Sequence, residues 1–370
     1  HALAWRLSIS PSVTKVYAIP GSAAMSDCAE LVGIDWQQSD HLIRFLKDNH
    51  VDLVVVGPEA PLVAGLADAL NVAGIPVFGP SKAAAQLEGS KVFAKDLMKK
   101  YNIPTAAYGV FHKVDEAKEF IAQTGAPIVV KADGLAAGKG VVVAMTVEEA
   151  NAAVEDMLSG NRFGEAGSTV VIEEFMDGEE ASLLAFVDGK TVVPMIASQD
   201  HKRIFDGDKG PNTGGMGTYA PAPVLTDALR DEAMKTILEP MVAAMQKEGM
   251  PYVGCLYAGL MITPQGPKVV EFNARFGDPE TQVVLPLLDS DLGQIMLACA
   301  TGTLTADMVK WKDSSAACVI LASKGYPETS SKGDVIHGDI KQHDTTIVFH
   351  SGTKLVGDEY VTNGGRVLGV

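Results

Sequence analysis

The residues best suited to chemistry lie in one short stretch in the last third of the chain. Glu271, Asn273 and Arg275 alternate along a predicted strand that begins with two valines. Because alternate residues of a strand point to the same side, we expect these three side chains to share a face. A carboxylate and an amide oxygen suit Mg²⁺ when phosphates supply further ligands, and a guanidinium suits phosphate or carboxylate. The spacing predicts a metal and phosphate site; a polar strand end leading into a turn is the alternative.

The composition limits the classes of protein to which this chain can belong. Its 370 residues are enough for about two or three domains with filled cores. Apolar residues make up 47% and charged residues 21%, as in ordinary globular proteins. The formal net charge of −16 argues against a nucleic-acid surface, which needs a basic stripe. Phosphorylated substrates stay compatible with this charge, because local cations and backbone amides hold them.

The cysteines and the apolar runs predict a cytoplasmic protein. The cysteines are far apart and lack C-x-x-C spacing, so we expect free thiols rather than a zinc site: Cys28, Cys255, Cys299 and Cys318. No apolar run reaches the roughly 18 residues of a membrane span. The first residues also lack the pattern of a signal peptide. We therefore expect neither membrane nor nucleic acid as a partner, and the oligomeric state stays open.

A glycine-rich stretch predicts a phosphate-binding flap. Lys131 directly follows the predicted strand 127–130, and a second strand is predicted at 141–144. Backbone amides of a flexible loop between two strands can wrap phosphates. The loop residues concerned are Gly134, Gly138, Lys139 and Gly140. The stretch is not a Walker loop, because it lacks the G-x-x-x-x-G-K-[ST] pattern. A plain glycine-rich hairpin is the alternative.

Lys91 is a second candidate for binding phosphate. It lies in the first turn of a predicted amphipathic helix, 90–102. A cation there opposes the helix dipole unless an anion joins it. A solvated lysine is the alternative.

Residues 1–80 alternate between predicted helices and strands. The continuous apolar run 51–56 is typical of a buried parallel strand, and it ends just before Glu59. In doubly wound folds ligands gather at the carboxyl ends of strands, so Glu59 could bind ribose hydroxyls. A carboxylate that stabilises a helix N-terminus is the alternative. A helix is predicted at 1–7, where a strand and a glycine-rich turn should begin the fold, so we expect the first βα unit to be absent.

Two polar stretches follow the flap. After the predicted strand 169–172 comes an acidic run, 173–180, whose backbone could meet a purine edge and whose last acid could meet ribose hydroxyls; an acidic hinge is the alternative. The stretch 199–217 is predicted to be a long functional loop, with a mobile surface loop as the alternative. Lys202 and Arg203 could bind anions there, and its glycines allow backbone to approach a ligand closely.

The last part of the chain reads as a long helix, 227–248, then a hairpin of strands 252–262 and 267–273 that carries the opening motif. Short strands are predicted afterwards, with Gly and Asp turns between them, at 316–322, 346–350 and 361–370. They indicate a small β-rich module, and we expect it to be truncated.

Taken together, these motifs resemble the phosphoribosylamine–glycine ligase (glycinamide ribonucleotide synthetase) family of the ATP-grasp superfamily. The resemblance rests on Lys-Ala-Asp-Gly-Leu-Ala-Ala-Gly-Lys-Gly from Lys131, Asn-Thr-Gly-Gly-Met-Gly from Asn212, and Glu-Phe-Asn-Ala-Arg-Phe-Gly-Asp-Pro-Glu from Glu271. It extends over essentially the whole chain. It implies an α/β protein with a Rossmann-like domain at 1–89, an ATP-grasp domain of two α+β lobes at 90–300, and a C-terminal β-rich module at 301–370. The smaller flap lobe would span about 105–176.

The resemblance also implies roles for individual residues. ATP would be held by Lys91, Lys131, Gly138, Lys139, Gly140, Glu173, Glu174, Phe175, Met176 and Glu180. Mg²⁺ or Mn²⁺ would be held by Glu271 and Asn273, and Arg275 and Lys131 would act in catalysis. Substrates would meet His1, Glu59, Asp200, Lys202, Arg203, Asn212, Gly214, Gly215, Arg275 and Asp278. The strand at 256–262 lacks the acid that often completes a second metal site in this superfamily.

The implied reaction joins glycine to 5-phosphoribosylamine in purine biosynthesis: ATP transfers its γ-phosphoryl group to glycine to give glycyl phosphate and ADP, and phosphate leaves when the amine attacks. Positioning and charge neutralisation do most of the work in such a phosphoryl transfer. Another ATP-grasp ligase or carboxylase is the nearest alternative, and a non-catalytic nucleotide sensor is the alternative from a different class.

Overall fold

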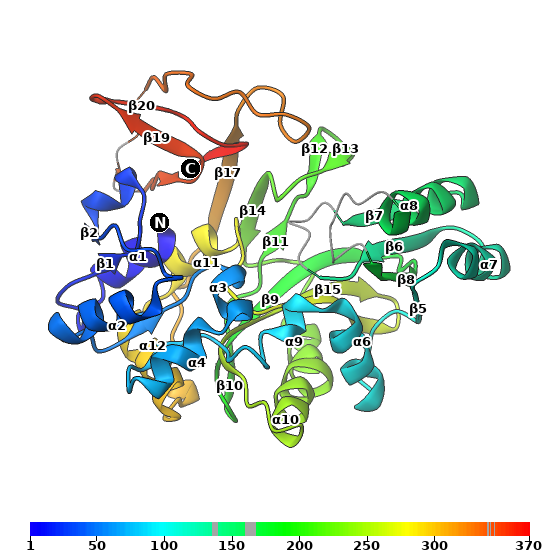
Figure 1. Cartoon of the computed structure of the whole chain (residues 1–370), viewed down its shortest axis with the longest axis horizontal. Helices are drawn as coiled ribbons and strands as arrows, with labels where there is room; N and C mark the ends of the chain where they lie inside the picture. The colour runs from blue at the N-terminus through cyan, green and yellow to red at the C-terminus, as the bar shows by residue number, and fades with distance from the viewer. Residues whose placement is uncertain (135–139, 160–167, 339, 341, 344) are drawn as a thin grey trace.

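The computed structural model of the chain describes residues 1–134, 140–159, 168–338, 340, 342–343 and 345–370. Figure 1 shows an N-terminal part on the left, a central sheet, a smaller lobe on the right and a C-terminal module at the top. Among the described residues, no helix has both the length and the apolar character needed to cross a membrane.

The N-terminal part alternates helices with short parallel strands. Its elements are α1 (Ala2–Ser8), β1 (Tyr17–Ala18), η1 (Ala23–Asp27), β2 (Glu30–Leu31), α2 (Ser39–Asp48), β3 (Val54–Val55), α3 (Glu59–Ala64), α4 (Leu66–Val72) and β4 (Val77–Phe78). Strand β1 pairs with β2 and β3 with β4, both in parallel, as the doubly wound pattern predicts. The apolar spacing of residues 62–73 predicts one helix there, but α3 ends at Ala64 and α4 begins at Leu66, because Gly65 between them adopts φ 100°.

The smaller lobe is an antiparallel sheet with two helices packed on it. Helices α5 (Gln86–Gly89) and α6 (Lys91–Lys100) lead into β5 (Tyr108–Phe111), α7 (Val114–Thr124), β6 (Ile128–Ala132), β7 (Val141–Ala144), α8 (Val147–Ser159) and β8 (Val170–Glu174). The strand order is β5-β8-β6-β7. Ile121 of α7 and Val154 of α8 pack on Ile128, Val130 and Ile172 of the sheet. This core gives the lobe a rigid platform from which Lys131 and Glu173 project.

The larger lobe contains a sheet that is buried on both faces. Its strands are β9 (Glu179–Asp188), β10 (Val192–Pro194), β15 (Val253–Thr263) and β16 (Gly266–Asn273), in the order β10-β9-β15-β16. Leu183 of β9 faces a core that includes Ile237, and the next residue, Leu184, faces one that includes Ile295. This alternation is the two-residue period of a strand.

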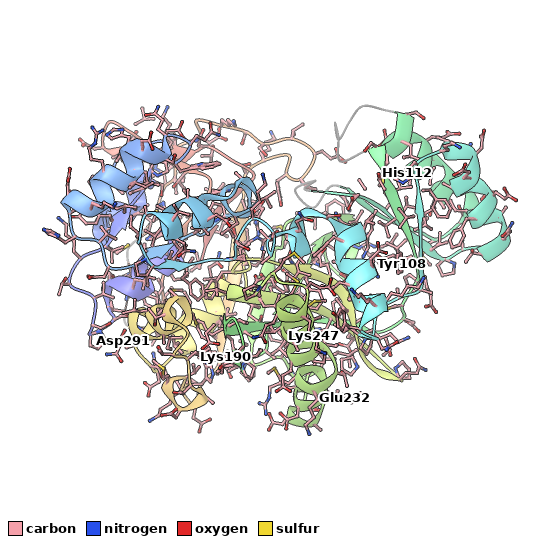
Figure 2. All side chains as sticks on the ribbon, turned by 60° about the horizontal axis from the view of Figure 1, so that its bottom comes forward. Tyr108, His112, Lys190, Glu232, Lys247 and Asp291 are labelled. Atoms are coloured by element: carbon pink, nitrogen blue, oxygen red, sulfur yellow. The ribbon has the colours of Figure 1, made fainter. Side chains whose placement is uncertain are left out.

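Helices cover the two faces of this sheet. On one side lie α9 (Asp227–Ala233), the π-helical turn η3 (Met234–Leu238) and α10 (Glu239–Lys247); on the other lie α11 (Thr281–Leu287) and α12 (Leu292–Thr301). The predicted helix 227–248 is therefore interrupted by a π-helical turn. Asp291, labelled in Figure 2, caps α12 and binds the backbone N–H and hydroxyl of Ser12, which ties the N-terminal part to this lobe.

The polar stretch 199–217 contributes strands to the sheet of the C-terminal module. That stretch forms β11 (Gln199–Asp200), β12 (Arg203–Phe205), β13 (Lys209–Asn212) and the start of β14 (Gly217–Ala220), so the prediction of a long loop is wrong. The later elements are η4 (Ala306–Met308), β17 (Ala316–Ala322), β18 (Phe349–His350), β19 (Thr353–Val356), β20 (Glu359–Thr362) and β21 (Arg366–Gly369). One sheet has the strand order β11-β14-β17-β21-β18. Backbone pairing with β17 makes the end of the polar stretch a strand, β14.

Candidate active site

Lys131 lies where the two lobes meet. Its ammonium is 2.9 Å from Oε1 of Glu173 and donates to the backbone carbonyl of Val270 on β16 at 3.0 Å. Strands β6 and β8 are neighbours, and Glu173 lies opposite Val129, two residues from Lys131 along β6. The smaller lobe thus places a buried cation beside the strand that carries Glu271.

Glu173, which is predicted to contact adenine, is bound by two lysines. Its second oxygen, Oε2, is 3.0 Å from the ammonium of Lys95, so two lysines share one carboxylate that is 3% exposed. Its backbone lies in a strand paired on both sides, with Tyr108 and Val129. The side chain of Glu173 is thus bonded to two lysines and its backbone lies between two strands, and its contact with adenine stays a prediction. Lys95 was missed; its only sequence signal is its position one helical turn after Lys91.

Lys91 and the glycine-rich stretch meet through Asp133. The Asp133 carboxylate accepts hydrogen bonds from the backbone N–H groups of Lys91 at 2.6 Å and Val92 at 3.2 Å, which supplies an anion at the N-terminus of α6. The Lys91 ammonium donates to the carbonyl of Gly134 at 3.0 Å. Burial lowers the pKa of Lys91, while the charge of Glu271 opposes that shift.

The remaining flap residues stand as follows. Gly138 and Lys139 lie outside the described residues. Gly140 is described, and its carbonyl accepts from the backbone N–H of Ala132 at 2.8 Å.

Glu271 and Asn273 share a face of β16, as the alternation predicts. The Asn273 side chain helps to lower the pKa of the Glu271 carboxyl group. Burial works to raise the pKa of Glu271, but the charges of Lys202, Lys131 and Lys91 outweigh it and the pKa lies below its usual value. Glu271 is therefore an anion held among three lysines, and one carboxylate with one amide is a donor set that suits Mg²⁺ or Mn²⁺.

The donor set around Glu271 is small. Within the described parts of the chain there is no group of three or more His, Cys, Asp or Glu side chains that could hold a metal. Gly259 lies opposite Glu271 on β15, so β15 offers no acid at this register position. The residues thus fit one hard cation whose other ligands come from phosphates.

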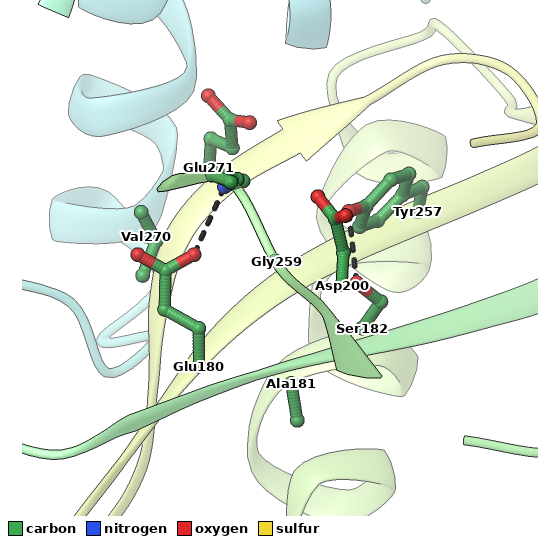
Figure 3. Close-up of a pocket in the computed structure, with 9 residues that line it drawn as sticks. Glu180, Ala181, Ser182, Asp200, Tyr257, Gly259, Val270 and Glu271 are labelled. Carbon is green, nitrogen blue, oxygen red and sulfur yellow. Dashed lines mark hydrogen bonds and ion pairs between the residues drawn. The ribbon is translucent and has the colours of Figure 1, made fainter. Parts of the chain in front are cut away.

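A pocket beside Glu271 brings together residues from both polar stretches (Figure 3). It is lined by Glu180, Ala181, Ser182, Asp200, Lys202, Tyr257, Gly259, Val270 and Glu271. The Lys202 ammonium is 2.9 Å from Oε2 of Glu180. Burial disfavours the charged form of Lys202, yet the carboxylates of Glu180 and Glu271 raise its pKa. Glu180, predicted to bind the ribose, therefore forms an ion pair with Lys202, a predicted substrate residue, next to the candidate metal ligand Glu271.

The far wall of this pocket is an acidic cluster, which we define as Ser182, Asp200, Tyr257 and Glu280. Oε1 of Glu280 accepts from the Tyr257 hydroxyl at 2.6 Å and from the Ser182 hydroxyl at 3.2 Å. Burial, and then the charge of Glu280, raise the pKa of Asp200 to about 8. Sequence reasoning predicted Asp200 but missed Glu280, although Glu280 ends the Arg-Phe-Gly-Asp-Pro-Glu motif; Ser182 and Tyr257 carry no sequence signal.

Arg275 is held by carboxylates from two other elements. Its guanidinium is 3.0 Å from Oε1 of Glu88 on α5 and 3.4 Å from Oε2 of Glu59, the first residue of α3. Glu88 also accepts from the backbone N–H of Ala274 at 2.7 Å. Burial lowers the pKa of Arg275, but these two carboxylates outweigh it and raise the pKa. Glu59 thus begins a helix and also contacts Arg275. Glu88 holds Arg275 as well, and no sequence pattern indicated that role.

The glycines after Asn212 contact the C-terminal module. The Arg366 guanidinium donates to the carbonyl of Gly214 at 2.7 Å and lies 3.2 Å from the carboxylate of Asp278. Gly215 has φ 113°, and a Cβ atom there would stand 2.6 Å from Oδ1 of Asp200. Only glycine fits this approach, so the predicted substrate residues Asp200, Gly214, Gly215 and Asp278 are neighbours.

Five further predicted residues lie in less enclosed positions. Arg203 and Asn212 are exposed partners on the hairpin β12–β13, and the Arg203 guanidinium donates to the carbonyl of Gly210. Glu174 is exposed, and Phe175 and Met176 are half-buried in the linker that joins β8 of one lobe to β9 of the other.

His1 packs at the boundary between the N-terminal part and the C-terminal module. Its ring meets the edge of Phe349 at 5.7 Å between centroids, and its Nδ1 accepts from the backbone N–H of His350 at 3.0 Å. The described contacts of this imidazole are therefore with the C-terminal module.

Family profiles match most of the chain. The phosphoribosylglycinamide synthetase N domain matches residues 1–88, the ATP-grasp (A) domain of that synthetase matches 89–281, and its C domain matches 316–370. Phosphoribosylamine–glycine ligase of Halalkalibacterium halodurans is 54% identical over 368 residues, covering 100% of this chain and 86% of the relative. That of Agrobacterium fabrum is 53% identical over 370 residues, covering 100% of this chain and 87% of the relative.

Solved structures agree with these sequence matches. A phosphoribosylamine–glycine ligase from Thermotoga maritima superposes with a TM-score of 0.85 at 33% identity, covering 100% of this chain and 88% of that chain. A biotin carboxylase from Campylobacter jejuni superposes with a TM-score of 0.72 at 16% identity, covering 100% and 84%. The second similarity concerns the fold alone.

Proposed function

The chain belongs to the phosphoribosylamine–glycine ligase family, and from this membership we propose how its residues perform the reaction. The activity is the ATP-dependent joining of glycine to 5-phosphoribosylamine, which gives glycinamide ribonucleotide, ADP and phosphate in purine biosynthesis. The observation that carries the proposed division of roles is the meeting of Lys131 from one lobe with the backbone next to Glu271 from the other.

ATP lies between the two lobes in this proposal. Lys131 and Lys91 bind its phosphates, and the linker of Glu174, Phe175 and Met176 contacts adenine. Glu180 binds the ribose, with Lys202 as its partner. The proximity of both lysines to Glu271, whose pKa their charges lower, supports this arrangement.

Glu271 and Asn273 hold Mg²⁺ or Mn²⁺. When bound, the cation neutralises charge on the phosphate oxygens. Glu271→Gln removes the charge and keeps the shape, so we expect turnover to fall by about two orders of magnitude or more, since such neutralisation is worth several kcal/mol, while nucleotide affinity falls less. The measurement is kcat and the ATP dissociation constant at saturating Mg²⁺. A kcat near that of the parent chain would refute the assignment.

The chemistry proceeds through glycyl phosphate. A glycine carboxylate oxygen attacks the γ-phosphorus, the bond from that phosphorus to the ADP oxygen breaks, and an acyl phosphate forms. The amine of phosphoribosylamine then attacks the acyl carbon; a C–N bond forms, the C–O bond to phosphate breaks, and the amine loses a proton. Arg275, held by Glu88 and Glu59, stabilises the developing negative charge. Closure of the two lobes keeps water from the acyl phosphate.

Phosphoribosylamine binds between the N-terminal part and the larger lobe. Glu59 of the N-terminal part contacts Arg275, which supports this placement. The predicted substrate residues Asp200, Lys202, Gly214, Gly215 and Asp278 gather on the other side of the motif strand, while His1, Arg203 and Asn212 complete the set. We place the enzyme in the cytoplasm, which its four free thiols support.

A coupled assay of ADP release tests the activity. We expect ADP only when ATP, a divalent cation, glycine and phosphoribosylamine are all present. Release supported by bicarbonate or formate in place of glycine would favour the carboxylase alternative, whose fold is similar. Hydroxylamine should trap glycine hydroxamate in the presence of ATP, cation and glycine; hydroxamate formed without ATP would contradict the acyl phosphate.

A further inference from the structure

Two buried lysines share one carboxylate in the smaller lobe, and only one of them was expected to bind ATP. The lysine–glutamate triad consists of Lys95, Glu173 and Lys131. The Lys95 ammonium is 3.0 Å from Oε2 of Glu173 and the Lys131 ammonium 2.9 Å from Oε1. All three side chains are 5% exposed or less. Charges taken this far out of water must be compensated by each other or by a ligand.

Lys95 is fixed from several elements at once. It belongs to α6, and its ammonium donates to the Thr105 hydroxyl at 2.8 Å. That hydroxyl donates in turn to the carbonyl of Val269 on β16 at 2.7 Å. The ring of Tyr108, labelled in Figure 2 on the smaller lobe, lies 5.7 Å from the ammonium. These contacts hold the Lys95 ammonium in place. The Lys131 ammonium instead donates to the carbonyl of Val270, next to Glu271, one of the two candidate metal ligands.

The charges of the triad do not cancel. Burial lowers the pKa of Lys95 to about 8 against the opposing charge of Glu173, so Lys95 is still mostly cationic at pH 7. Two ammonium groups and one carboxylate then leave one net positive charge. Without Lys95, Glu173 would neutralise Lys131 completely, and the attraction of Lys131 for an incoming phosphate would fall.

We propose that Lys95 is a positioning residue for ATP. Because Lys95 pairs with one of the two carboxylate oxygens of Glu173, Lys131 stays correctly placed and keeps positive charge available for the nucleotide phosphates. The inference rests on the proposed role of Lys131 as a phosphate ligand. Lys95 itself touches no substrate. Its effect is confined to the phosphate end of the nucleotide, because the triad lies beside Val270 and not in the linker that joins the lobes.

The test measures equilibrium binding of a non-hydrolysable ATP analogue and of adenosine to the full chain. Lys95→Met keeps the length of the side chain and removes its charge. We expect affinity for the analogue to fall about tenfold, within the range for one hydrogen bond to a charged group, and affinity for adenosine to stay the same. Lys99→Met is the matched control: it lies one turn further along α6, is exposed, and should leave both affinities unchanged.

A double variant separates charge balance from structure. Lys95→Met with Glu173→Gln restores one net positive charge on Lys131 without restoring any contact of Lys95. We expect affinity for the analogue to return to within about threefold of the parent chain. A double variant that binds more weakly than Lys95→Met alone would overturn the inference, because it would show that Lys95 acts only by supporting the fold. Thermal unfolding of each variant confirms that folded protein is compared.

Lys131→Met separates this inference from the proposed function. If Lys131→Met weakens binding of the analogue and Lys95→Met does not, the positioning role is overturned while the phosphate role of Lys131 stands. If neither weakens binding, both are overturned.

Discussion

Two groups of buried polar and charged residues lie near β16, and they compensate buried charge in opposite ways. In the lysine–glutamate triad, Glu173 lies within 3.0 Å of two ammonium groups. In the acidic cluster, Glu280 is held by two neutral hydroxyls, those of Tyr257 and Ser182. The first group compensates its anion with cations, and the second surrounds its anion with hydrogen-bond donors that carry no charge.

The difference shows in the titration of the neighbouring groups. Burial lowers the pKa of Lys95 to about 8, while Glu173 works against that shift. In the acidic cluster, burial and Glu280 act together on Asp200 and raise its pKa to about 8. Oδ1 of Asp200 is buried and has no hydrogen-bond partner among the described residues. Each group therefore contains one side chain that titrates near pH 8: an ammonium group whose pKa is lowered in the triad, and a carboxyl group whose pKa is raised in the acidic cluster.

Breaking the triad should give the largest loss of stability. Glu173→Gln leaves two buried ammonium groups facing each other, and breaking a buried pair by removing one partner costs about 3–5 kcal/mol. Urea denaturation gives the free energy of unfolding. The control is Glu174→Gln at the exposed neighbour, where we expect a change within about 0.5 kcal/mol. A loss below about 1 kcal/mol in Glu173→Gln would show that the two lysines do not depend on this carboxylate.

Removing the charge of Lys131 should weaken nucleotide binding more than it lowers the stability of the fold. Lys131→Met leaves Glu173 paired with Lys95, so no buried charge loses its last partner. Affinity for ATP analogues should fall by one to two orders of magnitude, or about 1.5–3 kcal/mol for a hydrogen bond to a charged group. Calorimetric titration measures it. Unchanged affinity would mean that Lys131 only supports the structure.

Stability should depend on pH with opposite slopes in two windows. The pKa of Asp200 is about 8 in the folded chain and roughly 3.9 unfolded. The folded state therefore binds the extra proton, and stability falls as pH rises from about 4 to about 8. The pKa of Lys95 is about 8 folded and roughly 10.4 unfolded, so the unfolded state binds the extra proton above pH 8 and stability rises with pH.

Each slope is at most about 1.4 kcal/mol per pH unit. Urea denaturation across the pH range measures both. Asp200→Asn should flatten the falling part and leave the rising part, and Lys95→Met should do the reverse. A slope that survives its own substitution would assign the proton to another group.

Local periodicity explains what the sequence predicted correctly. The alternation of Glu271 and Asn273 is a property of any strand, and the Asn273 side chain does act on the pKa of Glu271. The strand at 141–144 has the predicted bounds, because it rests on its own apolar pattern. The glycine at position 65 splits a predicted helix because a left-handed residue is not visible in hydrophobic periodicity.

Contacts between distant residues explain what the sequence missed. Glu88 reads as an ordinary helix residue, and its bond to the backbone of Ala274 spans 186 positions. The stretch 199–217 is polar and glycine-rich, which is typical of a loop, yet Gly217 at its end pairs with Val319 in a strand far along the chain. In the sequence, Lys95 resembles any lysine on an amphipathic helix, because its partner Glu173 comes close to it only in the folded chain. Pairing over such separations depends on the assembled fold, which no local pattern contains.

The smallest effect should come from neutralising the acidic cluster. In Glu280→Gln, the side-chain oxygen still accepts from the hydroxyls of Tyr257 and Ser182, and repulsion of Asp200 disappears. The weaker hydrogen bonds and the lost repulsion offset each other, so the free energy of unfolding should change by less than about 1 kcal/mol. The pKa of Asp200 should fall below about 8 yet stay above its ordinary value, because burial is the larger cause. Carbon-13 NMR titration of the carboxyl group follows that pKa, and urea denaturation follows stability.

Glu280→Leu is the matched control for this substitution. It removes the same charge and also leaves the two hydroxyls without their shared acceptor, so it should cost about 1–3 kcal/mol more than Glu280→Gln. Equal stability of the two variants would show that the hydroxyls find other partners. A loss in Glu280→Gln as large as in Glu173→Gln would remove the contrast between the two groups, since it would mean that the charge of Glu280, and not its hydrogen bonds, holds the acidic cluster together.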